Sequence, residues 1–167
     1  AMKWIVSLTG LPEGAFGVFT SGGTAANLSA IVTAREYWRR DDTYKREKGL
    51  IITSIGAHSS IKSMAKVADV DILLVDTEEK LTGKALRETI DNLTFHQRKR
   101  LFAVVATGGT TNAGIIDDLE GIAEVCETER LWFHVDAAYG GGALAADSVR
   151  HLFKGIERSD SVTIDHH

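Results

Sequence analysis

An aspartate directly follows a run of apolar residues in the segment 131–141 (LWFHVDAAYGG). The run 131–135 predicts a buried strand, and Asp136 closes that strand at a turn of small residues. A carboxylate in this position can reach a ligand that lies across the carboxyl edge of a parallel sheet. In a poorly hydrated site it would keep a ring nitrogen protonated, because opposite charges stabilise each other's ionised forms. The alternative is a helix cap or a surface carboxylate at a turn.

A glycine-rich turn opens a helix in the segment 20–27 (TSGGTAAN). The first N–H groups of a helix lack partners within it and carry the positive end of its dipole, so such a turn can bind phosphate. Gly23 would let the backbone approach the anion, and the Thr24 hydroxyl could add a hydrogen bond. The segment lacks Gly-x-Gly-x-x-Gly and Gly-Lys-Ser/Thr, which disfavours a dinucleotide fingerprint and a P-loop. A plain capped turn is the alternative.

Further candidate residues follow two other predicted strands. His58 comes just past the strand 50–53, where its flat imidazole could stack on a cofactor ring and exchange a proton. The loop 106–114 (ATGGTTNAG) carries threonines and glycines suited to hydrogen bonds with a ligand. His134 shares a strand face with Asp136, but no third metal ligand stands at a suitable spacing, so we expect no metal. An anion site and a carboxylate for a ring nitrogen together indicate a phosphorylated heteroaromatic cofactor, with pyridoxal phosphate first.

Strands and helices alternate along the chain, and this alternation must position the candidate residues. The predicted strands are 17–20, 50–53, 71–76, 101–106, 131–135 and 161–165. One predicted helix already includes residues 1–4 and extends up to Pro12, and the others begin near residues 24, 58, 84 and 119. This order predicts an α/β fold with a mostly parallel sheet covered by helices on both faces. The chemistry then lies at the carboxyl ends of the strands.

The composition is that of a single globular domain. With 167 residues, 44% hydrophobic and 25% charged, the chain can bury a core and is neither disordered nor fibrous. A net charge of −4 gives no bulk attraction to nucleic acid or to an anionic membrane. The apolar runs are too short to span a bilayer. The one cysteine, Cys126, excludes an internal disulfide and fits a reducing, cytoplasmic compartment.

Five segments resemble, in order, those of the group II pyridoxal-phosphate-dependent amino acid decarboxylases. This family holds aromatic-L-amino-acid, glutamate, histidine and diaminobutyrate decarboxylases. The matching segments are 17–24 (GVFTSGGT), 57–60 (AHSS), 106–111 (ATGGTT), 134–141 (HVDAAYGG) and 160–167 (DSVTIDHH). Each motif is modest by itself, but five in sequence order form a specific match that extends over essentially the whole chain.

The resemblance implies fold-type I of the pyridoxal phosphate enzymes, in its large domain, and assigns residues to the cofactor. Gly23 and Thr24 would hold the phosphate. Thr107 would lie near the ring hydroxyl. Asp136 would pair with the ring nitrogen, as its position in the sequence also suggests.

The same resemblance assigns residues to the two ring faces and to the end of the chain. His58 would stack on the side of the ring that faces substrate, and Ala138 would pack under the other side. Asp165 and His167 would assist at the phosphate. Residue 166, often proline in the family, is histidine here, at a spacer position. His58 and Asp136 would be the catalytic residues.

In the family, the Schiff-base lysine directly follows the position of His167, where this sequence stops. We therefore expect the chain to be the central part of the cofactor-binding large domain, without the N-terminal segment and the C-terminal small domain. The implied reaction converts an L-amino acid to its amine and CO2, through a Schiff base and a quinonoid intermediate. The implied protein is a homodimer with the active site near the subunit interface.

Three alternatives stay open beside this hypothesis. One is another fold-type I enzyme, such as an aminotransferase, a carbon–sulfur lyase or an aldehyde synthase. The second is a catalytically inactive scaffold member of the same family that binds a partner. The third is a nucleotide-binding module, which the missing glycine and lysine fingerprints disfavour.

Overall fold

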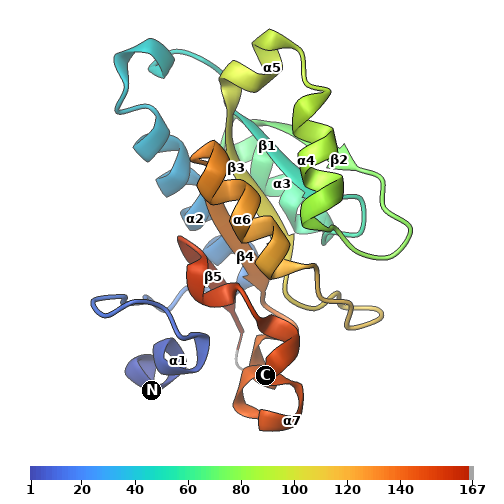
Figure 1. The fold of residues 1–167 in the computed structure, drawn as a ribbon. Helices are drawn as coiled ribbons and strands as arrows, with labels where there is room; N and C mark the ends of the chain where they lie inside the picture. The colour runs from blue at the N-terminus through green and yellow to red at the C-terminus, as the bar shows by residue number, and fades with distance from the viewer. Residues whose placement is uncertain (166–167) are drawn as a thin grey trace.

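The computed structural model describes residues 1–165, and this part of the chain is built on a five-stranded parallel sheet (Figure 1). The strands are β1 (Leu50–Ser54), β2 (Asp71–Val75), β3 (Leu101–Thr107), β4 (Trp132–Ala137) and β5 (Ser161–Ile164). They lie in the order β2-β1-β3-β4-β5, and every neighbouring pair is parallel. From β1 the chain forms β2 on one side of the sheet, and it then forms β3, β4 and β5 in succession on the other side. The direction of strand addition therefore reverses between β1 and β3. Ligands of open α/β sheets bind at the carboxyl edge beside such a reversal.

Helices cover both faces of this sheet (Figure 1). The helices are α1 (Met2–Thr9), α2 (Gly23–Trp38), α3 (Ser59–Val67), α4 (Gly83–Asp91), α5 (Phe95–Arg100), α6 (Leu119–Glu129) and α7 (Asp147–Arg150). Four short 3-10 turns lie at Asp42–Tyr44, Gly141–Ala145, His151–Phe153 and Ile156–Arg158. None of the helices within residues 1–165 is long and apolar enough to cross a membrane.

Two separate apolar cores explain this layering. Successive residues of a strand point to opposite faces of a sheet. Ile51 and Val105 therefore join the core under α2 and α3, whereas Ile52 and Val104 join the core under α4 and α6. All seven residues of β3 are buried, as expected for a central strand covered on both sides. The predicted α/β architecture is confirmed.

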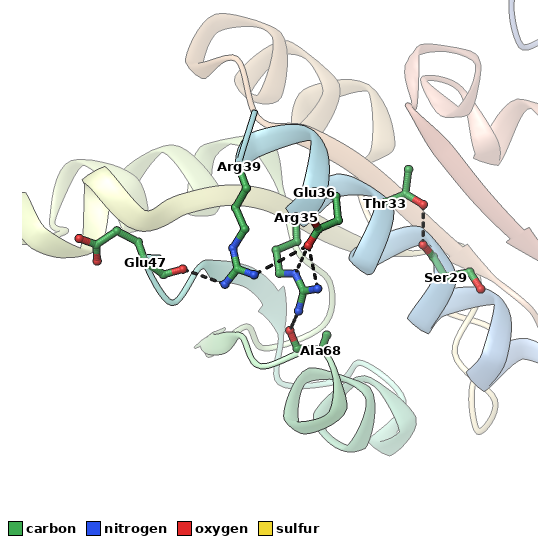
Figure 2. A network of polar contacts seen from close by, with 7 residues as sticks. All are labelled: Ser29, Thr33, Arg35, Glu36, Arg39, Glu47 and Ala68. Carbon is green, nitrogen blue, oxygen red and sulfur yellow. Dashed lines mark hydrogen bonds and ion pairs between the residues drawn. The ribbon is translucent and has the colours of Figure 1, made fainter. Parts of the chain in front are cut away.

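Polar contacts at the C-terminal end of α2 attach this helix to the neighbouring segments (Figure 2). Arg35 donates a hydrogen bond to the carbonyl oxygen of Ala68, which follows α3, and pairs with Glu36. Arg39 donates to the carbonyl oxygen of Glu47 at 3.0 Å. With its far end held in this way, α2 keeps its N-terminus at the carboxyl edge of the sheet.

Two sequence predictions are corrected by the structure. The predicted strand at 17–20 is wrong: these residues adopt no regular structure, and Val18 and Phe19 are 72% and 74% exposed. A β-branched and aromatic composition favours a strand only where a neighbouring strand completes its hydrogen bonds, and this segment has none within residues 1–165. Asp136 also lies inside β4 rather than at its end. The strand continues to Ala137 because that residue pairs with Ile164 of β5.

Candidate functional site

A pocket of about 200 Å3 opens at the carboxyl edge of the sheet. Its walls come from the N-terminus of α2 and from the segments that follow β1, β3, β4 and β5. Seven of the eight predicted cofactor-binding residues line it: Gly23, Thr24, His58, Thr107, Asp136, Ala138 and Asp165. The eighth, His167, lies outside the described residues. The fold thus gathers five distant segments at one place.

The N-terminus of α2 forms one wall of the pocket, and its N-cap residue makes no side-chain capping hydrogen bond. Its N-cap, Gly22, has a φ of 137°, a conformation that favours glycine. A Cβ atom on Gly23 would lie 3.0 Å from Cβ of Ala138 and 3.3 Å from Oδ2 of Asp165. The first turn carries no acidic residue. The N–H groups of a first helical turn, the positive end of the helix dipole and a backbone free of side chains at Gly22 and Gly23 together fit a phosphate.

Asp136 forms another wall of the pocket. It lies on β4 in register with Thr107 of β3 and Thr163 of β5, and it is 8% exposed. Its Oδ2 accepts a hydrogen bond from Nδ2 of Asn27 at 2.9 Å, and its Oδ1 accepts one from the N–H of Ala138 at 3.2 Å. Both oxygens act as acceptors, which is the arrangement of an ionised carboxylate. A cationic ring nitrogen in the pocket would therefore meet an oriented negative charge.

His58 lines the pocket as the N-cap of α3. Its Nδ1 accepts a hydrogen bond from the backbone N–H of Ser60 at 3.2 Å and lies 2.8 Å from Oγ of the same serine. Because Nδ1 serves as an acceptor, the hydrogen of the neutral ring belongs on Nε2. The side chain is exposed at the pocket wall. An aromatic surface with one fixed donor nitrogen is thus available to a ligand.

Thr107 is held from behind by Asp117, which is buried. The N–H of Thr107 donates to Oδ2 of Asp117 at 2.7 Å, and the N–H of Asp117 donates back to the carbonyl oxygen of Thr107 at 2.9 Å. The other oxygen, Oδ1, accepts from the N–H of Leu81 at 2.7 Å. Burial raises the pKa of Asp117 to about 6, although these backbone hydrogen bonds act in the opposite direction. Asp117 therefore fixes the end of β3 at the pocket.

Sequence analysis missed Asn27, which is 1% exposed and bridges two predicted residues. Its Nδ2 donates to Asp136, and its Oδ1 lies 2.9 Å from Nε2 of His134. The available signal was a polar residue on the buried face that Asn27 shares with Ile31 and Ala34. In the described part of the chain, His134 belongs to no group of three or more potential metal ligands.

Proteins of one kind resemble this chain in both sequence and fold. The family model described as "Pyridoxal-dependent decarboxylase conserved domain" matches residues 1–167. The chain is 34% identical over 172 residues to an aromatic-L-amino-acid decarboxylase of Bacillus atrophaeus. This alignment covers 99% of this chain and 35% of that protein. It is 36% identical over 168 residues to an L-2,4-diaminobutyrate decarboxylase of Rhizobium meliloti (strain 1021), covering 98% of this chain and 33% of that protein.

The fold of this chain is also similar to that of a decarboxylase of known structure. It is the glutamate decarboxylase domain of diaminobutyrate-pyruvate transaminase and L-2,4-diaminobutyrate decarboxylase from Vibrio parahaemolyticus. It matches with a TM-score of 0.85 at 30% identity, over 98% of this chain and 39% of that chain. The chain spans about a third of the length of the curated relatives that it matches.

Proposed function

This chain belongs to the pyridoxal-dependent decarboxylase family, as its five motifs predicted, and on that premise we propose that it is the central part of the cofactor-binding domain of an amino acid decarboxylase. The proposed reaction takes an L-amino acid and a proton and releases the amine and CO2. The observation that carries this proposal is one pocket with an anion cradle at α2 and the buried carboxylate of Asp136.

The residues of this pocket fit pyridoxal phosphate at both ends of that molecule. Gly23 and Thr24 at the start of α2 would hold the phosphate, and Asp136 would pair with the ring nitrogen. His58 and Ala138 would lie against opposite faces of the ring. When bound, the cofactor supplies a sink for the electrons of the bond that breaks at the α-carbon of the substrate.

The protein side chains would supply a fixed charge, a proton and hydrogen bonds. Asp136, held by two hydrogen bonds, needs no reorganisation while the reaction proceeds, and such preorganised charge is effective in a poorly hydrated site. His58, with its hydrogen on Nε2, would hold the ring and position the proton that takes the place of CO2 at the α-carbon. Thr107 would bond the ring hydroxyl, and Asp165 would assist at the phosphate.

We propose further that the full-length protein is a cytoplasmic homodimer with this pocket near the subunit interface. Phe16 and Phe19, on the segment that leads into α2, are 87% and 74% exposed, and Tyr139 at the pocket is 59% exposed. Exposed large apolar side chains that form one contiguous patch mark a surface that binds other protein, and the proposed interface would join these three in such a patch. The buried thiol of Cys126 is compatible with a reducing compartment.

Assaying the full-length protein with pyridoxal phosphate and a panel of aromatic, acidic and basic L-amino acids tests the proposal. We expect CO2 and the amine in equal amounts from at least one substrate. Asp136→Ala should lower kcat at least ~100-fold, because it removes a preorganised charge from the site. Circular dichroism should show an unchanged fold.

The matched control is Asp147→Ala, since the side chain of Asp147 is 96% exposed and outside the pocket. It should retain full activity. Near-normal turnover by Asp136→Ala would remove this residue from the mechanism. CO2 accompanied by an aldehyde instead of the amine would favour an aldehyde synthase, and a keto acid without CO2 would favour an aminotransferase.

A further inference from the structure

A chain of hydrogen bonds, part-buried at Trp132 and Ser161 and buried at Asn27, runs along one face of the sheet to Asp136. Nε1 of Trp132 donates to Oγ of Ser161 at 2.9 Å, and this Oγ lies 2.9 Å from Nδ1 of His134. Nε2 of His134 lies 2.9 Å from Oδ1 of Asn27, whose Nδ2 donates to Oδ2 of Asp136 at 2.9 Å. We call these five residues the buried relay.

The fold itself assembles the buried relay. Trp132, His134 and Asp136 alternate along β4 and therefore share one face of the sheet. Ser161 stands opposite His134 in the parallel register of β4 and β5. Asn27 reaches the same face from the first turns of α2, which also carries the proposed phosphate cradle. The helix that would bind one end of the cofactor thus also contacts the group proposed for the other end.

With a neutral His134, only one direction of hydrogen bonding satisfies every atom of the relay. The indole N–H of Trp132 can only donate, so Oγ of Ser161 accepts from it. An ionised Asp136 can only accept, so Asn27 turns its NH2 group to Asp136 and its Oδ1 to His134. His134 must then donate from Nε2 and accept the Ser161 hydroxyl hydrogen at Nδ1.

This arrangement requires a neutral imidazole, because a neutral ring has one donor and one acceptor nitrogen. His134 is completely buried. Burial lowers its pKa to about 4, although the charge of Asp136 and the carbonyl of Ser161 act in the opposite direction. At neutral pH His134 is therefore uncharged, and it accepts a hydrogen bond at Nδ1 while it donates one from Nε2.

We propose that the buried relay, acting through the Nε2–H tautomer of His134 and the amide of Asn27, positions the Asp136 carboxylate toward the ring nitrogen of the cofactor. This inference rests on the proposed function and deepens it. Trp132, Ser161, His134 and Asn27 are positioning residues. If these groups only satisfied one another in the core, disrupting them would lower stability without a specific effect on the cofactor.

The hydrogen positions test the relay without an activity measurement. Neutron diffraction from the full-length protein, or 15N NMR of the protein labelled in histidine, distinguishes the two tautomers. We expect His134 at pH 6 to be neutral, with hydrogen on Nε2 alone, both with and without cofactor. A hydrogen on Nδ1, or a doubly protonated ring at pH 6, would overturn the proposal.

Asn27→Leu tests the link between His134 and Asp136 while nearly keeping the side-chain volume. The hydrogen of His134 should move to Nδ1, since the acceptors that remain within its reach are then the hydroxyl and carbonyl oxygens of Ser161, 2.9 and 3.2 Å from Nδ1. The affinity for pyridoxal phosphate should fall about tenfold, as for the loss of one hydrogen bond to a charged group. Affinity within twofold of wild type would overturn the proposal.

The matched control is Thr53→Val, which removes a buried hydroxyl from β1 that donates to the carbonyl of Val105 at 2.8 Å. It should change neither the tautomer nor the affinity. If Asn27→Leu does not fold, Ser161→Ala tests the other end of the relay. It removes the donor to Nδ1 but leaves Asn27 in place, so the hydrogen of His134 should stay on Nε2, and a hydrogen found on Nδ1 would overturn the proposal.

The outcomes for the relay and for the proposed function are distinguishable. A wild-type protein that binds pyridoxal phosphate and releases CO2, but carries the hydrogen of His134 on Nδ1, would overturn the relay alone. A wild-type protein that binds no pyridoxal phosphate would overturn the proposed function and the role of the relay with it. The tautomer would still show whether the hydrogen bonds run as described.

Discussion

Gly23 leaves open the space between two walls of the pocket. A Cβ atom at this position would approach Ala138 and Asp165 at 3.0 and 3.3 Å, so these neighbours would have to move by a few tenths of an ångström. Gly23 is also the first residue of α2, where alanine is the better helix former. Cofactor affinity and protein stability should therefore respond differently to the same substitution.

We predict that Gly23→Ala in the full-length protein lowers the affinity for pyridoxal phosphate about tenfold, on the scale of one lost hydrogen bond to a charged group. The melting temperature of the apoprotein should stay the same or rise. Fluorescence titration and thermal unfolding measure the two quantities. Gly142→Ala is the matched control, since a Cβ atom there meets nothing within 4 Å. An unchanged affinity in Gly23→Ala would argue against a phosphate at this helix.

Single residues were predictable where their chemistry is visible in the local sequence. Gly23, His58 and Asp136 each belong to a recognisable motif at or near the end of an element, and the structure places all three at one pocket. Asn27 was missed because its partners His134 and Asp136 lie 107 and 109 residues away. Such contacts depend on the register of the sheet and on how α2 crosses it. Neither can be inferred from the spacing of residues in the sequence.

At the scale of elements, Asp117 joins three segments beneath the pocket. It stands just before α6, and its two oxygens accept from the N–H groups of Leu81, before α4, and Thr107, at the end of β3. Leaving either buried N–H group without a partner would destabilise the fold by about 1–3 kcal/mol. Burial raises the pKa of Asp117 from 3.8 to about 6. Asp117 therefore keeps its proton up to a higher pH in the folded chain than in the unfolded chain.

We therefore predict that Asp117 makes the free energy of unfolding fall as the pH rises from about 4 to 6. In this range the unfolded chain binds fewer protons than the folded chain, and stability then decreases with pH. The difference in pKa corresponds to about 3 kcal/mol. Above pH 6 the contribution stays constant, because Asp117 is ionised in both states. Urea unfolding of wild type and Asp117→Asn at pH 4, 5, 6 and 7 measures the effect as a difference.

The comparison with a variant is needed because His134 has the opposite effect. Burial lowers its pKa from 6.5 to about 4, so the unfolded chain binds more protons and stability rises with pH over that range. Asp147→Asn, on an exposed carboxylate, should reproduce the wild-type profile. A constant difference between wild type and Asp117→Asn across all four pH values would contradict the prediction.

Elements were predictable where apolar periodicity and burial agree. The strands β1 to β5 are found within two residues of their predicted ends. The inner strands β1, β3 and β4 are almost wholly buried, whereas the edge strands β2 and β5 have one buried residue each. Helix α5 was missed because it is short and has no buried residue, although its capping box at Thr94 and Gln97 was visible in the sequence. The false strand at 17–20 has strand composition without a partner strand, and only the tertiary structure reveals this difference.

At the scale of the whole molecule, the exposed aromatic side chains lie at different ends of the chain's fold. Phe16 and Phe19 belong to the segment that leads into α2, toward the carboxyl edge of the sheet. Phe95, 78% exposed, begins α5, which precedes β3 at the opposite edge (Figure 1). If the proposed homodimer buries the surface near the pocket, only the first pair contributes to it.

We predict that the double variant Phe16→Ser/Phe19→Ser shifts the full-length protein from dimer to monomer, whereas Phe95→Ser leaves the dimer intact. Each phenylalanine buried in an interface stabilises it by about 1.5–3 kcal/mol. A symmetric dimer contains every position twice, so the loss should raise the dissociation constant more than ~100-fold. Sedimentation equilibrium over a range of concentrations measures it. A double variant as dimeric as wild type would exclude this segment from the interface, and equal weakening by Phe95→Ser would indicate a general loss of solubility or fold instead of a specific contact.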